Sequence, residues 1–394
     1  MRIGVPKETA ERERRAALVP DVVKQLTEKK LQVTVESGAG EGASHPDSEY
    51  TDAGAELGDP WGADVLLKVA PPTDAEVARL KQGQVVIGFL QPLTNTALAK
   101  GLAGAGVTSF AVEVIPRITR AQSMDALSSQ ANLGGYMSVL IAARDSGNLF
   151  PMMTTAAGTI APAKVLVLGA GVAGLQAIAT AKRLGGVVTG FDVRSVVKEQ
   201  VESLGGRFLE VEAVKDAEGE GGYARPLTEE ENQRLREELA AAAKRQDVIV
   251  STAAIPGRPA PLLITADAVR GMAPGSVIVD MAAETGGNCE LTKPGETVIE
   301  GGVQVIGPLN LPSEMAQDAS ALYAKNLSNL LELMLDEEGK LALDFDDEVI
   351  AGACLTHEGE IRNEGARDAA QASPGRVSGP EVRETPVDPE EDAP

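Results

Sequence analysis

The sequence is poor in the residues that metal binding and acid–base catalysis most often use. It has two cysteines and two histidines in 394 residues, and aromatic residues make up only 3%. Two cysteines cannot build a disulfide framework or a Cys-rich zinc site, and His45 and His357 lie far apart in the sequence. We therefore expect no metal site and no catalysis that depends on histidine.

The sequence also lacks an excess of basic residues and long apolar runs. It holds 36 Lys and Arg against 58 Asp and Glu, which gives a net charge of −22. A surface this acidic repels phosphate backbones, so nucleic-acid binding is excluded as a main role. Charges follow the first residue too soon for a signal peptide, and the longest uncharged stretches contain polar residues and glycines. We expect a cytoplasmic protein that does not insert into the membrane.

What is abundant is Ala, Val, Leu and Ile, in a chain that is 43% hydrophobic. Short Val- and Ile-rich runs alternate with helical stretches, and this alternation is typical of α/β proteins with parallel sheets. Eleven such runs predict strands buried on both faces, in two sets: near Arg2–Val5, Leu31–Glu36, Val65–Val69, Val85–Leu90 and Val107–Val112, and near Val165–Leu168, Val187–Phe191, Phe208–Val211, Asp247–Ser251, Ser276–Met281 and Val303–Ile306.

The two sets predict two doubly wound parallel-sheet lobes with a cleft between them. Between them we expect a long helix, Asp125–Asp145, and a loop, Asn148–Pro162; a second long helix, Ser313–Asp336, follows the last strand. The predicted domains are a first lobe at 1–125, completed by 310–365, a second lobe at 126–309, and a disordered acidic tail at 366–394. Residues 336–394 hold 17 acidic and 5 basic side chains, and the tail has too little apolar content to fold.

The clearest motif is G-x-G-x-x-G, formed by Gly169, Gly171 and Gly174, directly after a predicted strand and at the start of a predicted helix. The three glycines would permit a tight turn, close approach of the backbone to a pyrophosphate, and close packing of helix on sheet. The N–H groups of the helix N-terminus would bind the phosphates. The motif predicts a dinucleotide site, although a tight turn without a ligand has the same pattern.

An acid stands where the next strand ends. Asp192 lies 23 residues after Gly169, and a carboxylate there accepts hydrogen bonds from adenosine ribose and repels a 2′-phosphate. This favours NAD over NADP. Arg194 points the other way, because an arginine near this acid can bind a 2′-phosphate. A second glycine cluster, Gly38–Ala43, also follows a strand but continues into Ser-His-Pro-Asp, and we interpret it as a turn.

A polar stripe opens the long helix after the first set of strands. Gln122, Asp125 and Ser128 recur every three residues, a few positions after Arg117. Such a stripe is usually a solvated helix face, but its neighbours are apolar enough for half burial. An arginine, an amide, a carboxylate and a hydroxyl together could bind a ribose and a carboxamide.

No Ser-His-Asp set or activated cysteine stands out. Oxidation of an alcohol or amine needs a positioned acid or base, whereas hydride transfer between two nicotinamides moves no proton to or from a substrate. Such a reaction needs only placement of the reacting carbons and exclusion of water.

From Met1 to about Ile361 the sequence resembles the NAD(H)-binding components of proton-translocating NAD(P) transhydrogenases. Five stretches carry this resemblance: Pro116–Gln130, Gly169–Gly185, Lys198–Gly206, Ile255–Pro261 and Gly286–Cys289. They are far more specific than the glycine motif, and the tail after Ala366 has no counterpart.

The resemblance implies two Rossmann-like lobes, a homodimer, and NAD(H) in the cleft. It implies two partners, an NADP(H)-binding component and a membrane proton-channel component, on the cytoplasmic face of the inner membrane. Hydride would pass directly between the nicotinamides, coupled to proton translocation. The residues that match the family's cofactor contacts are Arg117, Ile118, Thr119, Gln122, Asp125 and Ser128 around the nicotinamide; Gly169, Gly171, Val172, Gly174, Asp192, Val193 and Arg194 around the adenosine and pyrophosphate; Gly222 and Tyr223 in a closing loop; and Ala254, where the family often has Leu.

Two alternatives remain. Alanine dehydrogenase has a similar start, but it carries a catalytic Lys in a Lys-x-Lys-Glu-Pro segment and a catalytic His after the next strand. Here Ala70 stands at the Lys position, and Ile87–Gln91 contains no His. The other alternative is a non-catalytic NAD-sensing module, which differs from the transhydrogenase component only in its dependence on partners.

Overall fold

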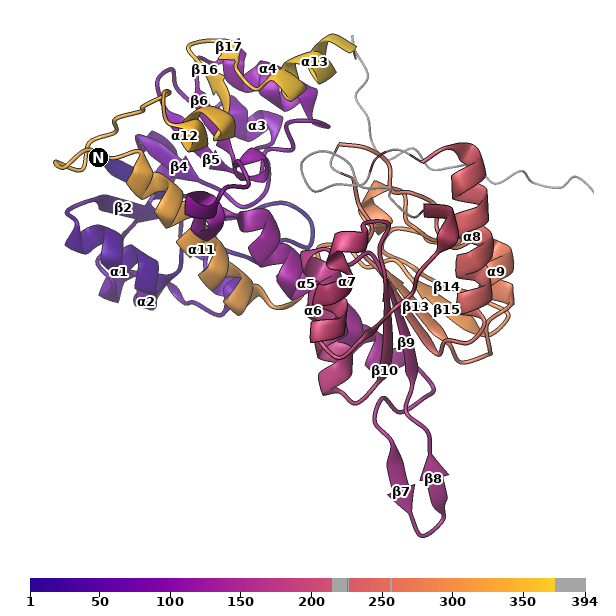
Figure 1. Cartoon of the computed structure of the whole chain (residues 1–394). Coiled ribbons are helices and arrows are strands. Elements are labelled where there is room, and N and C mark those ends of the chain that lie inside the picture. Colours follow the sequence, from indigo (N-terminus) through magenta and orange to yellow (C-terminus); the bar gives the residue numbers. More distant parts are fainter. Residues whose placement is uncertain (215–224, 226, 256, 373–394) are drawn as a thin grey trace, which may run out of the picture.

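The protein folds into two α/β lobes, seen side by side in Figure 1. The structure is a computed structural model that describes residues 1–372 except 215–224, 226 and 256. The first lobe contains an eight-stranded sheet in the order β17-β16-β6-β5-β4-β1-β2-β3, and the second a seven-stranded sheet in the order β11-β10-β9-β12-β13-β15-β14.

Strands β1 to β6 run parallel in the first sheet, while β16 and β17 add antiparallel strands at one edge. Their bounds are β1 Arg2–Val5, β2 Gln32–Val35, β3 Glu56–Leu57, β4 Val65–Leu67, β5 Val85–Gly88, β6 Thr108–Ala111, β16 Cys354–His357 and β17 Glu360–Ile361.

The second sheet is parallel apart from the β14–β15 pair. Its strands are β9 Lys164–Leu168, β10 Val187–Phe191, β11 Arg207–Phe208, β12 Val248–Ser251, β13 Val277–Asp280, β14 Thr297–Glu300 and β15 Val303–Ile306.

Helices cover both faces of each sheet, and the side chains of the central strands show this directly. Along β4, Val65 and Leu67 enter one core while Leu66 enters another. Along β9, Leu166 and Leu168 face one core while Val165 and Val167 face the other. Strands buried on both faces are apolar throughout, which makes them recognisable in the sequence. The predicted class, α/β with Rossmann-like parallel sheets, is confirmed.

The helices are α1 Pro20–Glu28, α2 Asp47–Asp52, α3 Asp74–Val77, α4 Thr96–Gly104, α5 Ala126–Asp145, α6 Val172–Arg183, α7 Lys198–Ser203, α8 Glu229–Ala243, α9 Ala266–Arg270, α10 Leu311–Glu314, α11 Ala316–Leu333, α12 Glu348–Ala353 and α13 Glu364–Ala372. Within the described residues no helix is both long and apolar enough to cross a bilayer.

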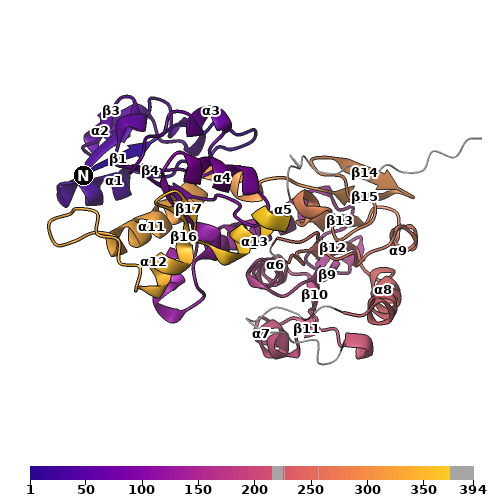
Figure 2. The ribbon, with the colours of Figure 1, turned by 90° about the horizontal axis from the view of Figure 1, so that it is seen from above.

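Helix α5 belongs to both lobes. Its first residue, Ala126, is buried in a core of the first lobe, while Val139 and Ala142 are buried in a core of the second. Helix α11 follows the second sheet in the chain but packs Leu327 and Leu330 into the first lobe, and Figure 2 shows it there from above. The chain thus crosses between the lobes at α5 and again before α11. The predicted domain boundary lies at Asp125, directly before a helix that both lobes share.

The expected loop at Asn148–Pro162 contains a hairpin, β7 Met153–Thr155 with β8 Gly158–Ile160. It projects from the second lobe (Figure 1). The hairpin was not predicted because its threonines, alanines and glycine carry neither a periodic pattern nor an apolar run. Strands β3, β14, β16 and β17 were not predicted either; they are strands of two to four residues at or near the sheet edges.

The predicted start of the disordered tail at Ala366 is wrong. Ala366 has no exposed surface and lies inside α13, whose N-terminus is capped by Asn363 Oδ1 accepting from the Ala366 N–H at 2.9 Å. The helix packs against α4, where Lys100 Nζ donates to the Ala370 carbonyl at 3.1 Å. Its alanine-rich sequence has little apolar mass, so only the tertiary contact reveals it. Residues 373–394 lie outside the described residues.

Candidate functional site

The glycine motif forms the turn between β9 and α6. Gly169 has φ +91°, which L residues with side chains rarely adopt. A Cβ on Gly174 would lie 1.8 Å from the Gly169 carbonyl oxygen, so this glycine lets the helix pack against the strand. A Cβ on Gly171, in contrast, would meet no protein atom within 4 Å. Two glycines are thus required by the protein's own packing, and the third faces open space.

The N-terminus of α6 is suited to an anion. Gly171 is its N-cap and supplies no side-chain acceptor, and the following Val172 is 42% exposed. The first N–H groups of any helix have no partner within the helix, and the helix dipole adds positive potential there. A pyrophosphate placed over Gly171 would accept these hydrogen bonds. The residues present therefore fit a dinucleotide.

Asp192 follows the neighbouring strand β10 and lies beside this turn. Its Oδ2 accepts from the Ala170 N–H at 2.8 Å, and Arg194 contacts both carboxylate oxygens. Burial alone would raise the pKa of Asp192, but the hydrogen bonds from Arg194 and Ala170 outweigh it and hold the pKa below its ordinary value. Asp192 is therefore an anion at neutral pH. Val193, between Asp192 and Arg194, is half-buried.

The loop after β12 closes the third side of the turn. Thr252 donates to the carbonyls of Leu168 and Gly169, at 3.3 and 3.1 Å, and Ala254 is exposed two residues later. The carboxyl ends of β10, β9 and β12 therefore converge on one place, as expected at the point where strand order reverses in an open parallel sheet.

A buried polar network lies under this loop and was not predicted. Asn288 Oδ1 accepts from Ser251 Oγ at 2.6 Å and from the Ala253 N–H at 3.1 Å, and its Nδ2 donates to the Ala253 carbonyl at 2.8 Å. Asp280 in turn accepts from the Asn288 N–H at 2.7 Å. The network fixes the backbone of the loop that carries Ala254. The only signal for it in the sequence is the Gly286–Cys289 stretch, which carries the family resemblance without indicating a role.

The polar stripe lies at the start of α5. Asp125 is the N-cap of α5: its Oδ1 accepts from the Ser128 N–H at 2.8 Å, and its Oδ2 accepts from Ser128 Oγ at 2.6 Å. Gln122 lies one turn earlier in the 3₁₀ turn η4 (Thr119–Met124) and is exposed. Arg117 and Thr119 are also exposed, and Ile118 is half-buried. The structure thus joins Asp125 and Ser128 directly.

Helix α5 sets the distance between the two groups of residues. A Cβ on Gly135 would lie 2.1 Å from the Ala173 carbonyl oxygen, so α5 crosses the first turn of α6 in close contact. Ser128 lies seven residues before Gly135, which is about 10 Å along the helix axis. One rigid helix therefore holds the Asp125–Ser128 pair at a fixed offset from the glycine turn. That offset suits a ligand with a phosphate at one end and a ribose and ring at the other.

Two other sequence features have different outcomes. The Gly38 cluster forms a turn whose Gly38 N–H is already bound by Asp47 Oδ1 at 2.8 Å, consistent with its interpretation as a turn. Gly222 and Tyr223 lie outside the described residues. In the described portion of the chain, no group of three or more His, Cys, Asp or Glu side chains could hold a metal ion.

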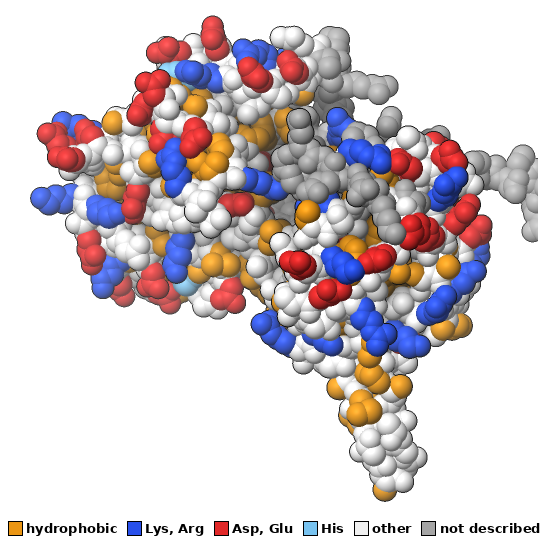
Figure 3. Space-filling model, viewed as in Figure 1, with side chains coloured by type: hydrophobic (Ala, Val, Ile, Leu, Met, Phe, Trp, Pro, Cys, Tyr) orange, Lys and Arg blue, Asp and Glu red, His pale blue; other side chains and the backbone are white. Residues whose placement is uncertain are grey.

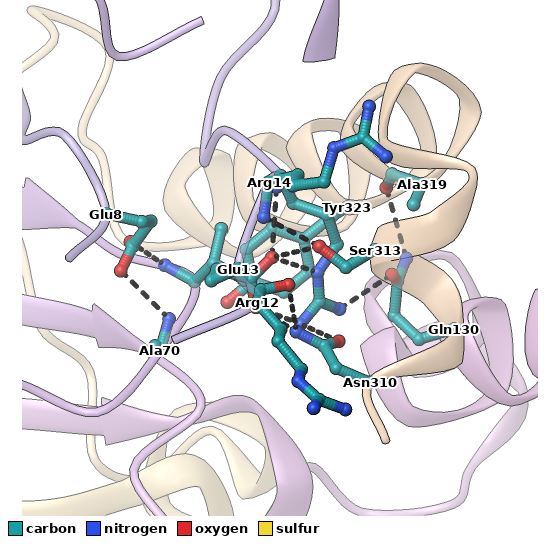
Figure 4. A network of polar contacts seen from close by, with 12 residues as sticks. Glu8, Arg12, Glu13, Arg14, Ala70, Gln130, Asn310, Ser313, Ala319 and Tyr323 are labelled. Carbon is teal, nitrogen blue, oxygen red and sulfur yellow. Dashed lines mark hydrogen bonds and ion pairs between the residues drawn. The ribbon is translucent and has the colours of Figure 1, made fainter. Parts of the chain in front are cut away.

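Charged side chains meet where the lobes join. Arg15 donates to Glu13 Oε2 at 2.6 Å, to Gln130 Oε1 of α5 at 2.9 Å and to Asn310 Oδ1 at 3.3 Å. Figure 4 shows Glu13, Gln130 and Asn310 converging from different segments. These residues connect the first lobe with both crossings of the chain, and their mutual pairing leaves them a structural role.

Lys68 is the buried lysine nearest the alanine-dehydrogenase-like segment. It is 1% exposed, and its Nζ lies 3.0 Å from Glu76 Oε1 and 3.2 Å from Glu8 Oε2. Glu8 also accepts from the Ala70 N–H at 3.3 Å (Figure 4). A cation held between two carboxylates is a poor proton donor or acceptor for a substrate.

Comparison with known proteins gives matches along nearly the whole chain. Residues 4–134 match the N-terminal domain and residues 138–364 the C-terminal domain of the alanine dehydrogenase/PNT family. The chain is 49% identical over 374 residues to the first of the separate polypeptides named NAD(P) transhydrogenase subunit alpha in Rhodospirillum rubrum, covering 92% of this chain and 97% of that protein.

A transhydrogenase structure from Sinorhizobium meliloti is similar, with TM-score 0.83 and 45% identity over 92% of this chain and all of that one. The alanine dehydrogenase of Mycolicibacterium smegmatis is more distant, at 30% identity over 379 residues, covering 92% of this chain and 95% of that protein.

Proposed function

The chain belongs to the alanine dehydrogenase/PNT family, and on this premise we propose that it is the NAD(H)-binding component of a proton-translocating NAD(P) transhydrogenase. In this proposal its partners are an NADP(H)-binding component and a membrane proton-channel component, on the cytoplasmic face of the inner membrane. The observation that carries NAD(H) binding is the uncapped N-terminus of α6, where Gly171 faces open space beside the Asp192 carboxylate.

Each predicted residue then has a role in holding the dinucleotide. The first turn of α6 binds the pyrophosphate, and Asp192 accepts from the adenosine ribose. The Asp125–Ser128 pair binds the second ribose, and Gln122 and Arg117 orient the carboxamide side. Ile118, Thr119, Val172, Val193 and Ala254 supply the surrounding contacts.

The bound nicotinamide supplies the hydride chemistry. The protein's task is to fix the ring against a second ring held by the partner and to exclude water. No side chain is needed as a proton donor, which agrees with Ala70 at the catalytic Lys position and with Lys68 paired to Glu8 and Glu76. This is why we favour the transhydrogenase component over an amino-acid dehydrogenase, despite the similarity to alanine dehydrogenases.

We also propose that the protein is a homodimer and that the β7–β8 hairpin contributes to the contact. A two-stranded hairpin is marginally stable alone, and this one exposes Met152 by 66%, Met153 by 42% and Ile160 by 50%. The sequence has no charged residue from Met152 to Ile160, and Figure 3 shows the hairpin as an uncharged projection below a charged surface.

The decisive experiment mixes this protein with a separately prepared NADP(H)-binding component and follows hydride exchange from NADPH to an NAD⁺ analogue. Exchange in the mixture, and in neither protein alone, supports the proposal. Coenzyme binding without exchange in the mixture would instead indicate a sensing module. NADH formation from L-alanine and NAD⁺ by this protein alone would indicate an amino-acid dehydrogenase.

A further inference from the structure

The segment Pro116–Asp125, which we call the site loop, carries Arg117, Gln122 and Asp125. Its only regular element is the 3₁₀ turn η4, whose N-cap residue Ile118 forms no side-chain hydrogen bond. Short 3₁₀ turns have poor internal hydrogen-bond geometry. The conformation of the site loop therefore depends on contacts with other segments of the protein.

Contacts from the C-terminal third of the chain reach the site loop at its start and near its end. At its start, Gly352 of α12 packs so closely that a Cβ there would lie 2.6 Å from Pro116 Cγ. Near its end, the Ser123 carbonyl accepts from Asn326 Nδ2 at 2.8 Å and from Asn329 Nδ2 at 3.0 Å, both on α11.

The middle of the site loop is held by an ion pair. Arg120 Nη1 donates to Asp347 Oδ2 at 2.8 Å, and Arg120 Nη2 donates to Asp347 Oδ1 at 2.9 Å. Asp347 is itself fixed, because it is the N-cap of α12 and its Oδ1 accepts from the Val349 N–H at 2.8 Å. The hydrogen bonds from Arg120 lower the pKa of Asp347, so the pair is charged over the physiological range.

We propose that Arg120 and Asp347 are positioning residues for hydride transfer, because their bidentate ion pair locks the site loop in the conformation that presents Arg117 and Gln122 to the nicotinamide end of the coenzyme. This inference rests on the proposed function. Arg120 lies on the same short turn as Gln122 and three residues after Arg117, so a shift of Arg120 moves both. An exposed ion pair contributes little to global stability, and its loss should leave the fold intact. Bidentate geometry, however, specifies orientation as well as distance.

The test uses the full chain with the NADP(H)-binding component and compares Arg120→Ala, Asp347→Asn and the double variant. Asn keeps the N-cap acceptor of α12 but removes the charge. Each single variant should lower hydride exchange at saturating coenzyme by about tenfold, because small misplacement of reacting groups is costly. The double variant should be no slower than the single ones, and Arg120→Lys should recover some of the rate.

Two controls separate positioning from general damage. Binding of 5′-AMP, which needs only the adenosine side of the site, should stay unchanged in all variants. Arg270→Ala removes an arginine of similar exposure that pairs with Asp267 and Glu300, away from the site loop, and should exchange at the wild-type rate. A wild-type rate in Arg120→Ala, or additive losses in the double variant, overturns the inference. Absence of exchange in the wild-type mixture would refute the proposed function instead.

Discussion

Arg194 donates to both carboxylate oxygens of Asp192, from Nε to Oδ1 and from Nη2 to Oδ2, each at 2.9 Å. The acid and the base that point to opposite coenzymes in the sequence are therefore one ion pair. Ribose hydroxyls must share the carboxylate with this guanidinium. The negative charge that repels a 2′-phosphate is partly compensated by Arg194, which weakens the discrimination that Asp192 provides.

We predict that the protein binds NADH more tightly than NADPH and that Arg194→Ala widens this preference. Removing the guanidinium leaves the Asp192 charge uncompensated, and the change of about 1.5 kcal/mol corresponds to about tenfold in the affinity ratio. Asp192→Asn should narrow the preference. Fluorescence titration with both coenzymes measures the ratio, and Arg183→Ala, which removes the same charge at the far end of α6, should not change it. An unchanged ratio in both site variants would contradict the role given to Asp192.

We predict opposite effects for alanine at two glycines of one turn. Gly171→Ala should leave the melting temperature unchanged, because its Cβ enters open space, but it should weaken NADH binding by obstructing the pyrophosphate. Gly174→Ala should lower the free energy of unfolding by about 1–3 kcal/mol, since its Cβ collides with the Gly169 carbonyl. Thermal denaturation and coenzyme titration distinguish the two. Normal NADH affinity in Gly171→Ala would show that the phosphates lie elsewhere.

We predict that Glu113 makes the protein less stable as pH rises. Its Oε1 accepts from the N–H groups of Leu90 and Gln91 at 2.7 and 2.6 Å, whereas Oε2 is buried and has no partner among the described residues. Burial raises the pKa of Glu113 to about 7 from an ordinary value of 4.5. The folded state thus holds a proton that the unfolded chain releases near pH 4.5. This contribution, about 3 kcal/mol, is fully present below pH 4.5 and is lost as pH rises to about 7.

Denaturant unfolding between pH 4 and 8 checks this for wild type and Glu113→Gln, which keeps the shape and the acceptor. The stability difference should favour the variant increasingly up to about pH 7 and then level off. Glu11→Gln, on an exposed side chain, serves as the control. Parallel curves for wild type and Glu113→Gln would mean that Glu113 is ionised in the folded protein.

We predict that the β7–β8 hairpin supports the dimer. The double variant Met152→Ser/Ile160→Ser should shift the protein toward the monomer at micromolar concentration in analytical ultracentrifugation, because it removes apolar surface from the proposed contact. Ile299→Ser changes a residue of 68% exposure on another edge strand and should leave the mass unchanged. A persistent dimer in the double variant would place the interface elsewhere.

The elements of the fold that were predictable are those whose residues carry a local pattern. The central strands are apolar on both faces, and α5 is a long helix bounded by Asp125 at its N-cap. The short strands β14, β16 and β17 lack such a pattern because they are stabilised by pairing with a neighbouring strand. Helix α13 was assigned to the tail for a similar reason: its folding depends on packing against α4.

The sequence by itself determined the glycine turn and its acid, since Gly169, Gly171, Gly174 and Asp192 follow from the spacing of one strand–helix–strand unit. Only the tertiary structure decided how far this turn lies from Asp125 and Ser128, because that distance depends on where α5 crosses α6 at Gly135 and Ala173. Local steric rules act over a few residues and are legible in the chain. Contacts such as Arg120 with Asp347, separated by 227 residues, exist only once both lobes have folded.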